Sequence, residues 1–132
     1  MVGYSGTPLP HKLGIRDGSR VAIVGAPRGF ALDAPAAHIQ TSLRGTQPFD
    51  VVVTFVLARA DLAPRIAAAR VRMTPAAGLW IAWPKKSSGV ATDMTGQAIR
   101  DVALPTGLVD NKVCAIDDTW SGLRLVLRRE LR

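Results

Sequence analysis

The chain has few of the residues that hold metals or form disulfides. Its 132 residues include one cysteine, Cys114, and two histidines, His11 and His38. A single cysteine excludes an internal disulfide and a cysteine-based zinc cluster. Because the two histidines are also far apart in the sequence, no metal-ligand spacing exists, and we expect no metal site.

Long apolar runs are absent as well. Residues 1–14 contain no apolar stretch of the kind found in a secretory signal, and no segment approaches the length needed to cross a bilayer. The composition, 48% hydrophobic and 20% charged, is that of a globular protein. We therefore expect one α/β domain over 1–132, cytoplasmic and without a membrane partner.

Aromatic residues make up only 5% of the chain, whereas the net charge is +7, from 17 basic and 10 acidic residues. A positive field favours acidic partners: nucleic acid, a small anionic molecule or an acidic protein surface. The basic residues are scattered along the sequence, and no array of aromatic side chains for base stacking accompanies them. We therefore expect nucleic acid less than a small anion or an acidic protein. The sequence predicts no oligomeric state.

Apolar patterning predicts the secondary structure. Continuously apolar runs indicate strands buried on both faces, and the alternation over 36–43 indicates an edge strand. Two later strands read as a hairpin. The expected strands are 20–25, 36–43, 50–56, 79–83, 108–116 and 123–131, and the expected helices are 62–73 and about 94–104. This order predicts a Rossmann-like three-layer α/β sheet with a parallel centre and a C-terminal antiparallel hairpin.

Finer expectations follow for several segments. Glycine and proline predict an irregular amino-terminal arm, 1–19, which Leu13 and Ile15 pin to the core. The 62–73 helix begins after Asp61 as its cap, and Thr74 to Gly78 end it. We expect Arg65, Arg70 and Arg72 to lie on the solvent-exposed face of this helix.

Period-two spacing gives further expectations for the strands. Trp80 and Trp83 should point to opposite faces of the sheet, because they are three positions apart. Cys114 should be a buried structural thiol that shares a strand face with Leu108 and Ile116.

The stretch 83–95 carries the clearest candidate for a binding site. A buried strand leaves through a Lys/Ser/Gly loop and enters a helix near residue 94, where Thr92 or Asp93 would be the cap. Backbone N–H groups at a helix start and two ammonium groups suit an anion. The alternative is that Lys85 and Lys86 are solvated and the loop only connects.

Two other turns should lie at the same sheet edge, since ligands bind at the carboxyl ends of parallel strands. They are the glycine turn 25–29 and the hairpin turn 117–122. The predicted ligand-binding residues are Lys85, Lys86, Ser87, Ser88, Gly89, Thr92, Asp93, Arg28, Gly29 and Trp120.

Catalytic chemistry has weaker support. Asp117 and Asp118 near the two lysines could form an acid/base pair, or they could be turn residues that face solvent. No Ser/His/Asp spacing supports a nucleophile, so the sequence assigns no catalytic residue.

Two resemblances are visible. Residues 83–93 (Trp-Pro-Lys-Lys-Ser-Ser-Gly-Val-Ala-Thr-Asp), 108–117 (Leu-Val-Asp-Asn-Lys-Val-Cys-Ala-Ile-Asp) and 119–124 (Thr-Trp-Ser-Gly-Leu-Arg) resemble a short bacterial family of the DUF3052 type, a domain of unknown function. The order of elements, with its reversed final hairpin, is similar to a cut-down Rossmann-like methyltransferase core.

The chain departs from the methyltransferase pattern at three places. The turn 25–29 lacks Gly-x-Gly, Leu43-Arg44 stands where an acidic residue would hold the ribose, and no Asn-Pro-Pro-type motif follows 51–56. We therefore expect no bound cofactor. The favoured hypothesis is a non-catalytic binding or regulatory module for an anionic ligand or acidic partner. The alternative is a small enzyme of nucleotide or phosphorylated-metabolite chemistry.

Overall fold

The computed structural model describes residues 6–132, so the first five residues of the predicted arm lie outside the described residues. Six strands form one sheet in the order β2-β1-β3-β4-β6-β5. They are β1 (Arg20–Val24), β2 (His38–Gln40), β3 (Phe49–Phe55), β4 (Met73–Pro84), β5 (Leu108–Ala115) and β6 (Trp120–Leu127). The helices are α1 (Leu9–Lys12), α2 (Leu62–Arg70) and α3 (Gly96–Ala103), with short 3-10 turns η1 (Arg59–Asp61), η2 (Lys86–Ser88), η3 (Leu104–Thr106) and η4 (Arg129–Leu131).

The sheet has a parallel centre and an antiparallel end, which confirms the predicted fold class. Strands β2, β1, β3 and β4 are parallel, whereas β6 is antiparallel to both β4 and β5. The carboxyl ends of β1, β3 and β4 therefore share one edge with the start of β6, which we name the carboxyl edge. The opposite amino edge holds the starts of those strands and the end of β6.

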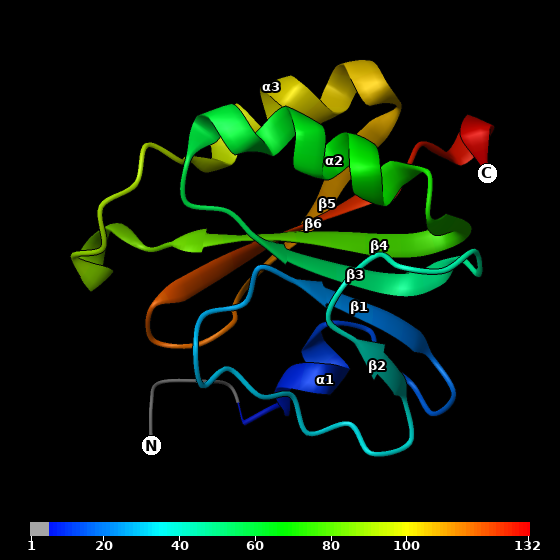
Figure 1. The fold of residues 1–132 in the computed structure, drawn as a ribbon. Coiled ribbons are helices and arrows are strands. Elements are labelled where there is room, and N and C mark those ends of the chain that lie inside the picture. Colours follow the sequence, from blue (N-terminus) through cyan, green and yellow to red (C-terminus); the bar gives the residue numbers. More distant parts are fainter. Residues whose placement is uncertain (1–5) are drawn as a thin grey trace.

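The two faces of the sheet are covered differently (Figure 1). Helices α2 and α3 pack on one face, the helix face, whose core includes Ile66 and Ile99, both fully buried. The arm with α1, and the irregular segment 25–37, cover the other face, the arm face. Leu13 and Ile15 are buried there, as predicted, although the arm also contains the short helix α1, which the sequence pattern does not predict. None of the helices within 6–132 is long and apolar enough to span a bilayer.

The two tryptophans of β4 lie on opposite faces, which confirms the period-two prediction. Trp80 belongs to the arm-face core and is fully buried. Trp83 is half-buried and packs against the helix-face core. A strand that buries large side chains on both sides is the expected centre of a doubly covered sheet.

The boundary between α2 and β4 differs from the prediction. The helix ends at Arg70, and the segment 74–78, predicted to end it, is already part of β4. Pairing with β3 steps from Phe49–Met73 to Val51–Gly78, so a bulge absorbs the extra residues. Periodicity alone does not reveal such an insertion.

The helix caps also differ. Asp61 makes no side-chain cap hydrogen bond, because η1 runs directly into α2 and Asp61 already has helical dihedral angles. Helix α3 begins at Gly96, two residues later than predicted, and its cap is Thr95, whose side chain accepts a hydrogen bond from the Ala98 N–H at 3.0 Å.

Thr92 and Asp93, the predicted caps, instead fasten the loop to the segment that follows β3. The Thr92 hydroxyl donates to the Leu57 carbonyl oxygen at 2.5 Å, and the Asp93 carboxylate accepts from the Arg59 N–H at 2.6 Å. The loop after β4 and the segment after β3 are therefore tied together at the carboxyl edge.

The hairpin turn is shorter than predicted. An Asp117 carboxylate oxygen accepts hydrogen bonds from the backbone N–H groups of Thr119 and Trp120, and this side-chain turn lets β6 start at Trp120. Strand β6 then ends at Leu127, and η4 replaces its expected continuation. The edge strand β2 is likewise only His38–Gln40, shorter than the predicted 36–43.

The prediction for Cys114 was wrong about its strand face. Cys114 is half-buried and packs with Ile116 against the arm-face core, whereas Leu108 is in the helix-face core. The register of β5 against β6 shifts between Asp110 and Lys112. A bulge at that point reverses the alternation of side chains, so counting by two across it assigns the wrong face.

Candidate functional site

The carboxyl edge gathers the turns that the sequence predicts to lie together. The Lys85 N–H donates to the Thr119 carbonyl oxygen at 2.8 Å, which joins the loop after β4 to the hairpin turn. Phe55, the last residue of β3, packs edge-on against Phe30 and Trp120, with 5.0 Å between ring centroids in each pair. Three connections far apart in the sequence thus meet around the end of β3.

Four of the predicted ligand-binding residues line a common hollow. Lys86, Gly89, Thr92 and Asp93 surround an open space of about 600 Å³ that also contacts Trp83 and the start of α3. The backbone of Gly89 has φ +77°, a left-handed conformation that favours glycine, and Gly89 ends the turn η2. The hollow has one cation, Lys86, and one carboxylate, Asp93, among its lining residues, so its charge is mixed.

The other predicted residues in the loop lie outside this hollow. Lys85 is half-buried, and Ser87 is exposed on η2. The Ser88 hydroxyl donates to the Lys85 carbonyl oxygen at 2.7 Å and accepts from the Val90 N–H at 3.1 Å, so it holds the loop together. Ser88 therefore has a structural role.

The predicted residues outside the loop are not part of the hollow either. Arg28 and Gly29 are exposed in the segment after β1. Trp120 is predicted to lie in a surface turn, but it is only 8% exposed at the start of β6. Its ring is used in packing against Phe55, so it offers no face to a ligand.

A second feature of this edge is one that the sequence pattern does not reveal. Strand order reverses between β1 and β3, since the chain moves from β1 outward to β2 and then back to β3 on the other side. Such a reversal is where open α/β sheets bind ligands. The side chain of Arg65, from the first turns of α2, reaches this point and donates to the Thr54 hydroxyl at 3.0 Å and to the Phe55 carbonyl oxygen at 3.1 Å.

The Arg65 guanidinium is half-buried and unneutralised. No carboxylate within residues 6–132 lies close enough to form an ion pair with it. The Cβ of any larger residue at position 25 would lie 3.0 Å from Arg65 Nη1, so glycine at this turn makes room for the guanidinium. Burial of an unpaired charge is costly, and a bound anion would offset that cost.

A small cavity adjoins Arg65 between α2, the sheet and the segment after β2. Its volume is about 210 Å³, and most of its wall is aliphatic. The lining residues are Val24, Thr41, Ser42, Leu43, Val52, Thr54, Arg65, Ala68 and Ala69. The cavity thus places one guanidinium and three hydroxyl groups beside an apolar pocket.

One signal in the sequence could have pointed to Arg65. The first turns of a helix that follows a parallel strand lie over the carboxyl end of the sheet, and Arg65 is the fourth residue of α2. The helical pattern instead assigns Arg65, Arg70 and Arg72 to the wet side of the helix. The structure corrects this, because the three side chains are half-buried and all bond to other segments.

The predicted acid/base pair, Asp117 and Asp118, fits the alternative in which both are turn residues. Asp117 is used in the hairpin turn, and Asp118 is exposed. Within 6–132, no group of three or more His, Cys, Asp or Glu side chains is placed to hold a metal ion.

In three dimensions the chain is similar to solved structures that include methyltransferases. It matches the magnesium protoporphyrin IX methyltransferase of Synechocystis with bound SAM at a TM-score of 0.61 and 12% identity, over 84% of this chain and 71% of that one. A TehB-like SAM-dependent methyltransferase of Corynebacterium glutamicum gives 0.60 and 13%, over 92% and 88%. The fibrillarin pre-rRNA processing protein of Methanococcus jannaschii gives 0.58 and 11%, over 95% and 70%.

At these identities the likeness establishes only a methyltransferase-like Rossmann fold. It does not extend to activity, because one fold can carry many different activities. No protein-family model and no curated protein matches the chain. The resemblance of its motifs to the DUF3052 family therefore stays a prediction.

Proposed function

We propose that this chain is a binding or regulatory module with a methyltransferase-like fold, which holds a small organic anion at its carboxyl edge and catalyses no reaction. The observation that carries the proposal is the half-buried guanidinium of Arg65 at the strand-order reversal, without a carboxylate partner within 6–132. Arginine binds carboxylates and phosphates through paired N–H groups, and such charge-assisted contacts are strong.

The cavity beside Arg65 suggests the size and polarity of the ligand. Its volume of about 210 Å³ is below the roughly 300–1,000 Å³ of sites for drug-sized molecules. An engineered apolar cavity of about 150 Å³ accepts benzene. A short aliphatic or single-ring carboxylate therefore fits best, with its apolar body between Val24 and Ala69 and its carboxylate on Arg65.

The residues present do not fit SAM, the molecule bound in the Synechocystis structure. Residues 25–37 contain no helix, so no helix start faces the end of β1. The space beyond β1 is taken by Arg65 and by the Phe55 backbone, which lie 3.0 and 3.2 Å from a Cβ at position 25. No carboxylate occurs between Gln40 and Pro48 to hold ribose hydroxyls.

The predicted loop 84–93 belongs to the same proposal as a second contact region. Lys86 is exposed and lines the 600 Å³ hollow, which Thr95 and Gly96 at the start of α3 also line. Asp93 in the same hollow opposes an anion, so we assign the anionic group to Arg65 rather than to Lys86. The membership of the DUF3052 family, which the motifs 83–93 and 108–117 suggest, is proposed together with this role.

A thermal-shift screen tests the proposal. The panel contains short-chain and aromatic carboxylates, each beside its neutral amide, and SAM. A ligand that binds only the folded state at 100 times its Kd adds about 2.7 kcal/mol to the free energy of unfolding. We expect at least one carboxylate to raise the melting temperature and its amide to have no effect.

Two outcomes would contradict the proposal. Stabilisation by SAM would instead support the alternative, a small enzyme. If no carboxylate raises the melting temperature, or if each amide raises it as much as the matching acid does, the anion site at Arg65 does not exist.

A further inference from the structure

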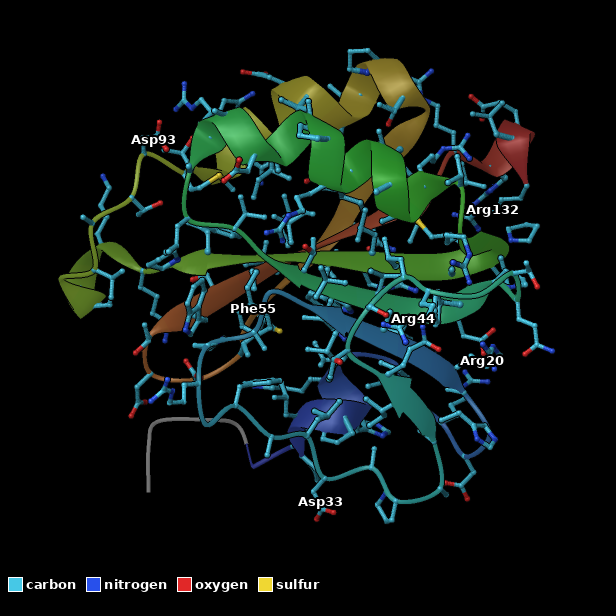
Figure 2. All side chains as sticks on the ribbon, in the orientation of Figure 1. Arg20, Asp33, Arg44, Phe55, Asp93 and Arg132 are labelled. Atoms are coloured by element: carbon cyan, nitrogen blue, oxygen red, sulfur yellow. The ribbon has the colours of Figure 1, made fainter. Side chains whose placement is uncertain are left out.

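Arginines that are scattered along the sequence gather at the amino edge of the sheet. Arg20 begins β1, and Arg44 is in the segment that leads to β3. Arg72 directly precedes β4, and Arg129 and Arg132 follow β6, which ends at this edge because it is antiparallel. Figure 2 shows Arg20, Arg44 and Arg132 on one side of the molecule, away from Phe55 and Asp93.

One group of arginines is fixed around Phe49. The guanidinium carbon of Arg20 lies 5.5 Å and that of Arg72 lies 5.0 Å from the centre of the ring, which is fully buried. Arg72 also donates to the Gln47 carbonyl oxygen at 2.7 Å, and Arg20 donates to the Pro48 carbonyl oxygen at 3.3 Å. Cation–π and carbonyl contacts orient these side chains without neutralising their charge.

A second group is held by carbonyl oxygens near the end of β6. Arg70 donates to the Thr106 carbonyl oxygen at 3.3 Å, Arg128 to that of Leu104 at 3.2 Å, and Arg132 to that of Leu127 at 2.9 Å. Burial first, and then the charge of Arg132, lower the pKa of Arg124. The second of these causes shows that like charges lie close together here.

Carboxylates do not balance this charge. Asp17, Asp50 and Glu130 belong to the same edge, but within 6–132 the ion pair that forms is Arg100–Asp110, at 2.9 Å. Asp50 is used to accept a hydrogen bond from the backbone N–H of Arg20 at 2.8 Å. The edge therefore holds more arginines than carboxylates, and within the described residues none of these arginines forms an ion pair.

We propose that the amino edge binds the phosphate backbone of double-stranded DNA, independently of base sequence. Guanidinium groups suit phosphate oxygens, and a duplex carries one negative charge for roughly each 1.7 Å of its axis. Single strands are usually held by stacking on exposed aromatic rings. The aromatic ring at this edge, Phe49, is fully buried beneath the arginines, so it cannot stack on a base.

Fluorescence anisotropy with a 20-base-pair duplex of mixed sequence tests the proposal at several salt concentrations. The test variant is Arg44→Gln/Arg129→Gln, and the matched control is Arg28→Gln/Arg59→Gln, which removes the same charge at the carboxyl edge. All four side chains are exposed, so both variants should fold. We expect the parent to bind with a steep salt dependence, and the slope of log K against log salt to lose about 2 units in the test variant only.

Several results would overturn this inference. If the two variants lose affinity equally, the duplex responds to net charge and not to the amino edge. If the single strand or a duplex of RNA binds more tightly than the DNA duplex, the assigned partner is wrong. If polyglutamate binds as tightly and loses affinity in the same variant, the edge is a site for acidic proteins. Absence of binding at low salt also refutes the proposal.

Discussion

Trp80 of β4 donates its indole N–H to the carbonyl oxygen of Leu13, 67 positions earlier in the chain, at 3.0 Å. Both residues are almost completely buried on the arm face. This contact attaches the amino-terminal arm to the centre of the sheet, so it links the layer without long helices to the most buried strand.

Replacement of Trp80 should therefore have two separable effects. Trp80→Ala removes a large buried ring and should lower the free energy of unfolding by about 3–5 kcal/mol. Trp80→Phe keeps most of the ring but leaves the Leu13 carbonyl oxygen unpaired, which should cost about 1–3 kcal/mol. Urea denaturation measures both values. Trp83→Ala is the comparison: its side chain is only half-buried and should cost less than Trp80→Ala. Equal losses at the two positions would argue against this packing.

The glycine turn after β1 gives a second prediction. Gly25 has φ +71°, and a Cβ there would lie 3.2 Å from the Phe55 carbonyl oxygen and 3.0 Å from Arg65 Nη1. Gly29 has φ +86°, but a Cβ at that position would meet nothing within 4 Å. Gly29→Ala should thus cost only the backbone strain, about 1–3 kcal/mol. Gly25→Ala should cost more in the same denaturation experiment. A smaller loss at Gly25 would mean that Arg65 does not approach this turn.

The cap of α3 gives a third prediction. Thr95→Ala removes the side-chain acceptor of the Ala98 N–H and should destabilise the protein by about 0.5–2 kcal/mol. Asp61 occupies the corresponding position of α2 but makes no side-chain cap hydrogen bond. Asp61→Ala is therefore expected to change the free energy of unfolding by less than about 0.5 kcal/mol. The reverse order of the two losses would contradict the assigned caps.

Cys114 gives a prediction that depends on pH. Burial raises the pKa of its thiol, and the nearby charges of Lys12 and Lys112 lower it by less. The folded thiol thus stays neutral to a higher pH than a thiol in the unfolded chain, which ionises near about 8.5. Iodoacetamide should react with the native protein more slowly than with the urea-unfolded protein at about pH 8, near that unfolded pKa.

The raised pKa of the Cys114 thiol also makes the stability of the protein depend on pH. The contribution of Cys114 to the free energy of unfolding is fully present below the pKa of the unfolded thiol. It is lost as the pH rises through the pKa of the folded thiol. Cys114→Ala should therefore flatten the decline in the free energy of unfolding as the pH rises from about 8 to about 10. A native thiol that reacts as fast as the unfolded one would show that it is ionised and accessible.

Much of the fold could be predicted from apolar patterning, because a parallel strand buried on both faces leaves a continuous apolar run. The runs around Val21, Val52 and Ile81 each form a central strand of the sheet. The errors arose where the regular spacing is interrupted. The bulges in β3–β4 and in β5 add residues that no period reveals, and the second one places Cys114 on the face opposite Leu108.

The candidate site was harder to predict, because it depends on how long side chains cross between elements. The sequence pattern assigns Lys86 and Gly89 to the carboxyl edge, and the structure brings them to one hollow. The same kind of pattern assigns Arg65 to solvent, since helical spacing does not show that its side chain turns back to the end of β3. Contacts of this kind depend on the distance between two elements, which propensity and period do not report.

The most direct measurement of the central claim is a calorimetric titration of the best carboxylate from the thermal-shift screen into three proteins: the parent, Arg65→Met and Lys86→Gln. Methionine keeps much of the apolar stem of Arg65 while removing the guanidinium. The Lys86→Gln variant is the control for the loss of a cation at the same edge. A partly buried charge-assisted contact contributes about 1.5–3 kcal/mol, so Arg65→Met should raise the Kd more than tenfold. Lys86→Gln should change it by less than about threefold. Equal binding by the parent and Arg65→Met, or a larger loss in Lys86→Gln, would contradict the assignment of the anion to Arg65.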